Sequence, residues 1–184
     1  MFHYVTMVTY KRVPIFKNNT ARDIFLRNLS ELRALHPFKL VGYVIMHDHV
    51  HLIINPLEPN ISVLLRKLKG KSAREIIDWL LANGHASSLT KLRLNVKDRE
   101  YAVWQKDSSA IDLFSHKFLQ QKLRYIHMNP VRAGYCESPE DWRGSSYRAY
   151  FPHDPGTIPI EIDVNPYWNN EDIIEASVGG QARL

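Results

Sequence analysis

Hydrophobic and polar residues follow two different periods along the first 150 residues of the chain. Runs rich in β-branched and aromatic residues, such as 2–10, indicate strands, whereas apolar residues three or four positions apart, such as Phe25, Leu29 and Leu32, indicate helices. The predicted strands are 2–10, 38–46, 50–54 and 101–104, and the predicted helices are 21–35, 61–82 and 114–128. The order of strand, helix, strand, strand, helix and strand is that of a ferredoxin-like α+β sandwich. We therefore predict a central antiparallel sheet with helices on one face.

Residues that favour helix ends flank the predicted helices. Thr20 is a good N-cap for the first helix, because its hydroxyl can accept a hydrogen bond from an unpaired backbone N–H. Asn83 and Gly84 predict the end of the second helix. Asn129 before Pro130 predicts the end of the third, since the residue that precedes a proline avoids helical backbone angles.

Charge is unevenly distributed along the chain. The 184 residues include 24 Lys and Arg against 19 Asp and Glu, a net charge of +5. Residues 152–184 contain six of the acidic residues and one basic residue, which leaves 23 basic and 13 acidic residues in 1–151, a net charge of +10. The length suits one domain, and we predict a single catalytic domain at 1–151 followed by an acidic tail at 152–184. A basic body favours a polyanionic partner, although a solvated basic surface is an equally good interpretation.

Cysteine content and hydropathy indicate the compartment. The single cysteine, Cys136, makes an internal disulfide impossible and excludes a multi-thiolate zinc or iron–sulfur site within the chain. The amino terminus lacks the charged start and apolar core of a secretory signal. No apolar run approaches the roughly 20 residues that span a bilayer. We therefore expect a soluble, cytoplasmic protein.

Segment 46–55, MHDHVHLIIN, places histidines in an otherwise apolar strand. Alternate side chains of a strand share a face, so we expect His49 and His51 to point the same way and Val50 to point the other way. Two imidazoles on one face can chelate a divalent metal. The alternative is a pair of ordinary strand histidines bonded to backbone carbonyls, since a buried polar group needs some partner. His47 has the same parity but falls in the predicted turn.

The helix predicted at 114–128 carries a tyrosine with cationic neighbours. Tyr125 and Asn129 are four residues apart and share a face, and Arg124, His127 and Arg132 are close in sequence. A protonated tyrosine hydroxyl is a poor nucleophile unless a metal or nearby cations draw charge from the phosphate that it attacks. The alternative is a half-buried tyrosine that only packs the helix.

Together these segments resemble the REP-associated tyrosine transposases, which belong with the single-tyrosine enzymes of the His-hydrophobe-His endonuclease superfamily. The resemblance covers roughly residues 1–150 and rests on four blocks that occur in the family's order. The blocks are Gly42-Tyr43-Val44-Ile45-Met46 with His49-Val50-His51, Val103-Trp104-Gln105-Lys106, Tyr125-Ile126-His127-Met128-Asn129-Pro130-Val131-Arg132-Ala133-Gly134, and Asp141-Trp142 with Ser145-Ser146-Tyr147. The histidine triplet is weakly specific by itself, whereas the tyrosine–asparagine–proline block after Trp-Gln is specific.

The resemblance implies a metal-dependent endonuclease and strand transferase of DNA transposition and recombination. It implies that Tyr125 is the catalytic nucleophile and that His49, His51 and Asn129 are ligands of Mg²⁺ or Mn²⁺. The substrate would be single-stranded DNA beside a hairpin, and the products a 5′-phosphotyrosine and a free 3′-hydroxyl. Related enzymes occur as monomers or homodimers, and such a protein would be associated with the nucleoid.

Three features depart from the family's pattern, one of which is the stretch after Trp104, with Ser108 and Ser109. The family commonly has Met-Pro-Asn before the first histidine, whereas Met46 is here followed by His47 and Asp48. This turn could place His49 differently and could let His47 compete for the metal. The acidic tail matches no motif of the family.

Basic residues on the helix predicted at 61–82 are candidates for DNA contact. In the resembled family the corresponding region contacts the hairpin, and lysines or arginines there would bind phosphates with little sequence preference. A solvated helix face is the alternative for each of them. The candidate DNA-binding residues are Arg66, Lys67, Lys69, Lys71, Arg74, Arg124 and Arg132.

Two other functions stay open. A member of the same family that has lost cleavage would be a catalytically silent hairpin-DNA-binding protein. A zinc hydrolase would use His47, His49 and His51 and keep an open fourth coordination position. The turn at 47–48 and the basic body disfavour the zinc hydrolase.

Overall fold

The computed structural model describes residues 1–58, 60–96, 99–150 and 160–164. Four strands form its central sheet in the order β2-β3-β1-β6, and each neighbouring pair is antiparallel. They are β1 (Phe2–Val8), β2 (Phe38–Ile45), β3 (His49–Pro56) and β6 (Ser109–Leu113). β3 lies between β1 and β2, which are connected through helix α1 (Asn19–Leu35), so the sheet has the split βαβ connectivity of a ferredoxin-like fold. The predicted α+β class is confirmed.

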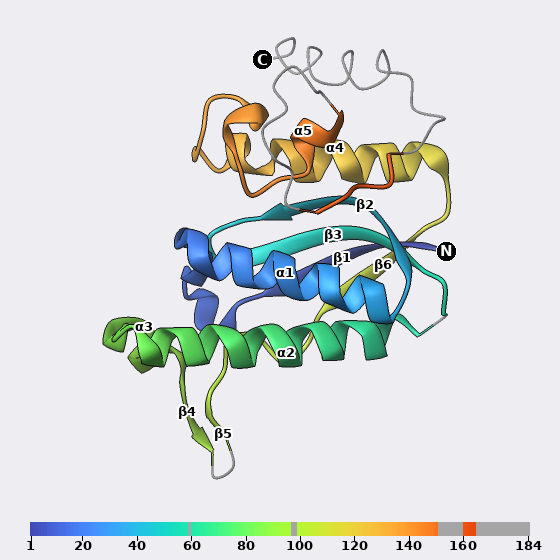
Figure 1. The fold of residues 1–184 in the computed structure, drawn as a ribbon. Coiled ribbons are helices and arrows are strands. Elements are labelled where there is room, and N and C mark those ends of the chain that lie inside the picture. The colour runs from blue at the N-terminus through green and yellow to red at the C-terminus, as the bar shows by residue number, and fades with distance from the viewer. Residues whose placement is uncertain (59, 97–98, 151–159, 165–184) are drawn as a thin grey trace.

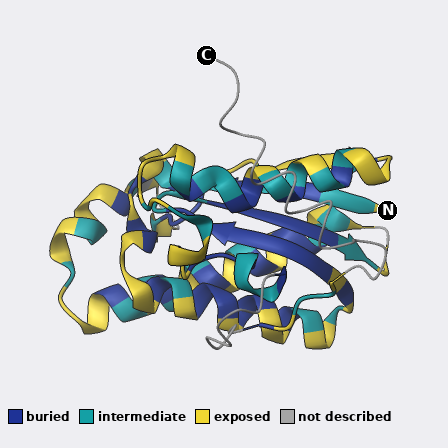
Figure 2. Ribbon diagram, turned by 90° about the horizontal axis from the view of Figure 1, so that it is seen from above, coloured by how far each residue is buried: buried dark blue, intermediate teal, exposed yellow. Residues whose placement is uncertain are grey.

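Helices cover both faces of this sheet (Figure 1). α1 and α2 (Ile61–Ala82) lie on one face, and α4 (His116–Arg132) lies on the other. Val50 and Leu52 of β3 belong to the core beneath α1 and α2, whereas Ile53 and Val44 belong to the core beneath α4. Figure 2 accordingly shows the central strands buried along most of their length. The prediction of helices on one face is therefore wrong: nearly continuous apolar strands need cover on both faces.

The fourth strand of the sheet lies later in the chain than predicted. Of the predicted strand at 101–104, Tyr101 ends the short strand β5 (Arg99–Tyr101), outside the central sheet, and Trp104 makes only an isolated bridge to Thr9, just after β1. β6 takes the edge position of the sheet instead. The Trp104 ring packs against Phe25, and its Nε1 donates to the hydroxyl of Ser72 at 3.1 Å. The apolar run at 101–104 therefore marks a buried connection. β6 is largely exposed, so it lacks the apolar signal of a core strand.

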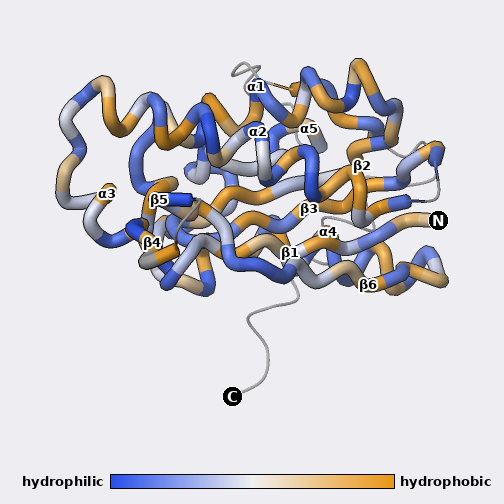
Figure 3. The backbone as a smooth tube through the Cα atoms, turned by 90° about the horizontal axis from the view of Figure 1, so that it is seen from below, coloured by the Kyte–Doolittle hydropathy of each residue, from blue (hydrophilic) through white to orange (hydrophobic). Residues whose placement is uncertain are grey.

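Short elements complete the described chain and pack around these layers. They are η1 (Tyr10–Arg12), η2 (Ile15–Lys17), α3 (Ala86–Leu92), β4 (Arg93–Val96), β5 (Arg99–Tyr101), η3 (Pro139–Asp141) and α5 (Tyr147–Tyr150). Hydrophobic and hydrophilic residues alternate along the helices (Figure 3), and the buried residues of α1, α2 and α4 are mostly apolar. None of the helices in the described ranges is both long enough and apolar enough to cross a membrane.

Two helix ends differ from the predictions. The N-cap of α1 is Asn18, whose side chain accepts a hydrogen bond from the N–H of Thr20 at 2.8 Å. α4 continues through Pro130 to its last residue, Arg132, because a proline in the final turn removes only one helical hydrogen bond. Gly134, with φ +71°, then closes the helix, and the N–H of Tyr135 donates to the carbonyl of Pro130 at 2.9 Å. The predicted bounds of α2 are confirmed.

The described part of the C-terminal region packs on the edge of the sheet. The N–H of Asp163 donates to the carbonyl of Leu40 at 2.8 Å, and its carboxylate accepts from the Leu40 N–H at 2.7 Å and from Arg33 at 2.5 Å. Ile160 is buried in the core beneath α1 and α2. These contacts pair the backbone of Leu40 at the edge of β2, and Ser145 bridges Val44 farther along the same strand. The rest of the predicted tail, 152–159 and 165–184, lies outside the described residues.

Candidate active site beneath helix α4

β3 places His49 and His51 side by side on the face of the sheet that α4 covers. They lie opposite Val8 and Thr6 of β1, and their ring centroids are 4.9 Å apart. Val50, between them, is fully buried in the core of the opposite face. The prediction that the two imidazoles share a face is confirmed, and it follows from the alternation of side chains along a strand.

A hydrogen bond holds Nδ1 of each imidazole. Nδ1 of His49 is 2.6 Å from Oδ1 of Asp48, while Nδ1 of His51 is 2.9 Å from both the Tyr4 hydroxyl and the Thr6 hydroxyl. Burial, and then the charge of His49, lower the pKa of His51 to about 3, so its ring is neutral near pH 7. With Nδ1 engaged, Nε2 is the nitrogen that each ring can offer to a metal. Neutral imidazoles oriented by such contacts are what a divalent metal requires.

Asp48 links His49 to a strained turn at the end of β1. Its second carboxylate oxygen accepts from Nη1 of Arg12 at 3.0 Å. Partial burial alone would raise the pKa of Asp48, but the hydrogen bonds from His49 and Arg12 outweigh burial and lower it. Lys11 and Arg12 both have positive φ, 51° and 53°, an unfavourable conformation for residues with a Cβ. This unfavourable backbone conformation places Arg12 where it can hold Asp48, and Asp48 in turn orients His49.

Helix α4 brings Tyr125 to the histidines. Its ring centroid is 5.8 Å from that of His51 and 6.3 Å from that of Tyr4, and 38% of the residue is exposed. Two cations flank the same ring, with Nζ of Lys122 at 5.7 Å and the guanidinium carbon of Arg132 at 5.5 Å from its centroid. The partly exposed Tyr125, the His51 imidazole and the two cations thus lie close together, with His49 beside His51. A tyrosine hydroxyl placed in this way can attack a phosphate while the cations offset the charge on the phosphate.

Asn129 follows Tyr125 by one turn of α4. The helix runs past the histidines, since Tyr125 contacts His51 whereas Tyr135, beyond the helix end, stacks on His47. Nδ2 of Asn129 is buried, and it has no hydrogen-bond partner within the described ranges. An unpaired Nδ2 is a free hydrogen-bond donor, so it can bind an acceptor such as a phosphate oxygen, whereas a metal would bind the Oδ1 of the same amide. The described residues contain no group of three His, Cys, Asp or Glu side chains that could hold a metal.

Three predicted neighbours lie elsewhere. His127 points away from Tyr125 into the core, where its Nε2 is 2.9 Å from the Ser146 hydroxyl and where burial lowers its pKa to about 3. The His47 ring stacks on Tyr135 at 4.1 Å. The three-histidine zinc site is therefore wrong, because the turn at 46–49 directs His47 away from the pair. Arg124 is half-buried on α4.

The basic residues of α2 lie across the sheet from Tyr125 (Figure 1). Lys69 donates to the carbonyls of Gln105 and Lys106 at 2.7 and 2.9 Å, so it supports that loop. Lys67 is 2.7 Å from a His36 ring nitrogen, and Lys71 pairs with Glu31. Arg66 and Arg74 are exposed. The predicted α2 residues and Tyr125 thus occupy opposite layers of the sandwich.

The sequence analysis missed four residues of the site: Tyr4, Thr6, Arg12 and Lys122. Tyr4 and Thr6 alternate along β1, so their shared face was readable from sequence. Their contact with His51 depends on the pairing of β1 with β3, which no local pattern reveals.

Comparison with known proteins connects this arrangement to a family. The family model described as "Transposase IS200 like" matches residues 1–127, a range that includes His49, His51 and Tyr125. A Haemophilus influenzae protein named as a REP-associated tyrosine transposase is 31% identical over 114 residues, 61% of this chain and 60% of that protein. This chain thus spans less than two thirds of that relative's length.

A solved structure of a REP-associated tyrosine transposase bound to a REP hairpin has a similar fold. Its TM-score is 0.63 at 17% identity, over 90% of this chain and 88% of that one. At this identity the similarity concerns the fold alone. It agrees with the sheet order and helix layers described above.

Proposed function

Since the chain belongs to the family of IS200-like transposases, we propose that it is a metal-dependent endonuclease and strand transferase acting on single-stranded DNA beside a hairpin. Tyr125 is the nucleophile. The observation that carries the proposal is the contact of its ring with His51, together with Lys122 and Arg132 at 5.7 and 5.5 Å from its ring centroid. A tyrosine that only packed the helix would not need a histidine and two cations around its ring.

His49 and His51 would hold Mg²⁺ or Mn²⁺ through Nε2, with the Asn129 side chain as third ligand. The fit rests on the two hydrogen-bonded imidazoles, of which His51 has a lowered pKa, and on the position of Asn129 one turn of α4 from Tyr125, where its Oδ1 would be the ligating atom. When bound, the ion withdraws charge from the phosphate that is attacked. Asp48, Tyr4 and Thr6 keep the two rings in the orientation that this requires.

The chemical step exchanges one phosphoester bond for another. The Tyr125 oxygen forms a bond to phosphorus as the bond from phosphorus to the 3′-oxygen breaks. The tyrosine proton is lost and the departing 3′-oxygen gains one, which leaves a 5′-phosphotyrosine and a free 3′-hydroxyl. Lys122 and Arg132 stabilise the charge on the phosphate. Since the number of phosphoester bonds is unchanged, the step is reversible, and strands can be rejoined.

Hairpin DNA is the proposed partner. The relative of known structure is bound to a REP hairpin, and residues 1–151 of this chain carry a net charge of +10. Arg124 and Arg132 on α4 and the basic residues of α2 are proposed phosphate contacts. The enzyme would act with the nucleoid in the cytoplasm, as a monomer or a homodimer.

The test is a covalent adduct between protein and DNA. The protein is incubated with labelled single-stranded hairpin DNA from the flanks of its own gene, with Mg²⁺ or Mn²⁺, and analysed on a denaturing gel. We expect a protease-sensitive slow band that is absent with EDTA and in Tyr125→Phe. Tyr101→Phe, the same change in the β4–β5 hairpin, is the matched control and should keep the band. An adduct that survives in Tyr125→Phe sinks the assignment, and hairpin binding without any adduct favours the catalytically silent alternative.

A further inference from the structure

We propose that Tyr135, supported by His47 and Trp142, is a stacking platform for one unpaired base of the DNA strand that the site cuts. The inference rests on the proposed function and adds a binding subsite to it. The three aromatic residues come from distant parts of the chain. His47 lies in the turn before β3, Tyr135 follows the end of α4, and Trp142 follows η3.

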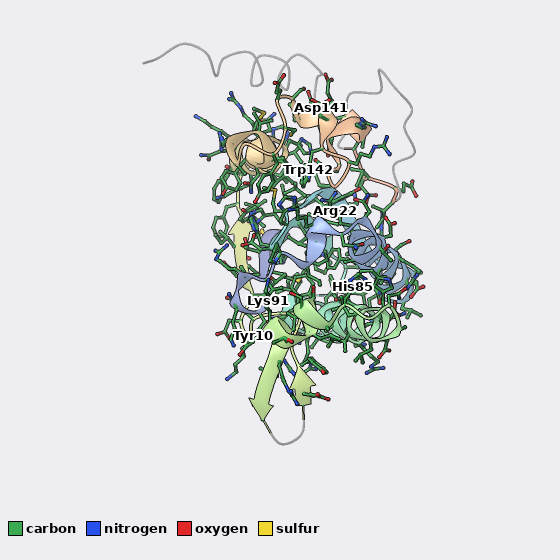
Figure 4. All side chains as sticks on the ribbon, turned by 90° about the vertical axis from the view of Figure 1, so that its left-hand side faces the viewer. Tyr10, Arg22, His85, Lys91, Asp141 and Trp142 are labelled. Atoms are coloured by element: carbon green, nitrogen blue, oxygen red, sulfur yellow. The ribbon has the colours of Figure 1, made fainter. Side chains whose placement is uncertain are left out.

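Trp142, the ring farthest from solvent in this cluster, is fixed by its contacts. Trp142 is buried, and its Nε1 donates to the Ile45 carbonyl at 3.0 Å. The Arg22 guanidinium lies 4.7 Å from the Trp142 ring centroid on the same end of the molecule (Figure 4) and donates through Nε to the Phe16 carbonyl at 2.6 Å. The platform therefore has a rigid base, which lowers the entropy cost of stacking a ligand on it.

Tyr135 is the exposed ring of the cluster, and both other rings lie on one side of it. Its centroid is 4.1 Å from that of His47 and 5.5 Å from that of Trp142, while His47 and Trp142 are 5.4 Å apart. If Tyr135 lay between the other two rings, their separation would approach the sum of the first two distances. Both rings therefore lie on the same side of Tyr135. Tyr135 is 42% exposed, and we infer that the exposed part includes the ring face turned away from His47 and Trp142, where a flat group can stack.

The platform adjoins the proposed reaction site on two sides. His47 precedes His49 by two residues, and Tyr135 follows α4, the helix of Tyr125. Arg132, the last residue of α4, is about 10 Å beyond Tyr125 at 1.5 Å of helix rise per residue. That distance is about three steps of a strand stacked as in a duplex, at about 3.4 Å per step, and fewer steps of a more extended unpaired strand. A strand attached to Tyr125 can therefore place a nearby base on Tyr135.

The surrounding charges favour a base as the ligand. The positive charges of Arg22 and Lys17 are close enough to His47 to lower its pKa, after burial. The carboxylate of Asp141 lies beside Trp142 (Figure 4). This mixture of charges disfavours a site for phosphate alone or for an acidic peptide. A nucleobase is flat and uncharged, and every base has a face that stacks on an aromatic ring. The platform should thus add affinity for the unpaired strand with little base preference.

The experiment measures binding in a Tyr125→Phe background without metal, so that cleavage cannot intervene. One labelled hairpin carries an unpaired flank of six nucleotides and the other has none. Adding Tyr135→Ala should weaken binding of the flanked hairpin by about 5-fold to about 150-fold, the range for losing one stacked base. It should leave the blunt hairpin unchanged. Tyr135→Phe keeps the ring and should bind like the parent.

An abasic scan locates the base. A single abasic position within about three nucleotides of the cleaved bond should weaken binding by the parent protein. It should add nothing in Tyr135→Ala, because both changes remove the same contact. Tyr135→Leu, which keeps an apolar residue after the helix, is the second variant in case Tyr135→Ala unfolds. Equal affinity of parent, Tyr135→Ala and Tyr135→Leu for the flanked hairpin overturns the platform alone, whereas a parent that binds neither hairpin overturns it together with the proposed function.

Discussion

Nδ1 of His49 lies 2.6 Å from Oδ1 of Asp48, the residue immediately before it. The contact selects one ring orientation and points Nε2 away from the carboxylate. Asp48 is in turn held by Arg12 at 3.0 Å. Where the resembled family commonly has asparagine, this chain thus has an anchored carboxylate, and the following prediction depends on that contact.

Removing the Asp48 carboxylate should weaken metal binding. We expect Asp48→Ala to lower Mn²⁺ affinity by about 10- to 100-fold, the usual effect of losing a group that orients a histidine ligand. Asp48→Asn should lose less, because its amide oxygen can still accept from Nδ1. Titration calorimetry measures both. Asp112→Ala removes a similar Asp–His contact, to His3 at 2.7 Å, and should leave affinity unchanged; equal losses in both alanine variants would contradict the orienting role.

Gly42 allows α4 to approach β2 closely. A Cβ at this position would lie 2.5 Å from Cδ1 of Leu123 and 3.0 Å from Cδ1 of Ile126, the two apolar residues around Tyr125. Gly42→Ala should therefore destabilise the fold by about 1–3 kcal/mol and displace Tyr125, reducing adduct formation. In a urea unfolding series, Gly42→Ala with Leu123→Ala should lose less than the sum of the single variants. Strict additivity would show that α4 adjusts without strain.

Basic residues of α2 should separate into two classes. Lys69 bonds the 105–106 backbone, so Lys69→Ala should destabilise the fold by roughly 1 kcal/mol or more. Arg66→Ala and Arg74→Ala should leave stability unchanged. If α2 contacts DNA, each should weaken hairpin binding and reduce the slope of log affinity against log salt by about 1. Unchanged slopes in both variants would place the DNA away from α2.

His127 should make stability fall in acid. Burial lowers the pKa of His127 to about 3 in the folded chain, against an ordinary value of about 6.5. Between these values the unfolded chain binds a proton that the folded chain does not, so stability is lost as pH falls from about 6.5 toward about 3. The slope is about 1.4 kcal/mol per pH unit for one proton. His127→Gln cannot titrate, so its stability in urea should fall less steeply below pH 6; parallel curves would refute this.

Local patterns were enough for most elements because their signals are short-range. The period of apolar residues located β1, β2, β3, α1 and α2 to within a few residues. Alternation along one strand predicted the shared face of His49 and His51, and helical spacing predicted that Tyr125 and Asn129 share a face of their helix. β6 was missed because an exposed edge strand needs no apolar run. The end of α4 was misplaced because a proline in the last turn costs little.

The amino-acid sequence by itself determined which side chains carry the chemistry and which of them share a strand or helix face, since both depend only on neighbours along the chain. Only the tertiary structure decided which faces meet. The β1–β3 register puts Tyr4 and Thr6 on His51, and the packing of α4 on β2 puts Tyr125 above the histidines. The same packing sends His47 to Tyr135 and His127 into the core. These contacts join residues far apart in the chain, and burial across the whole domain selects among them.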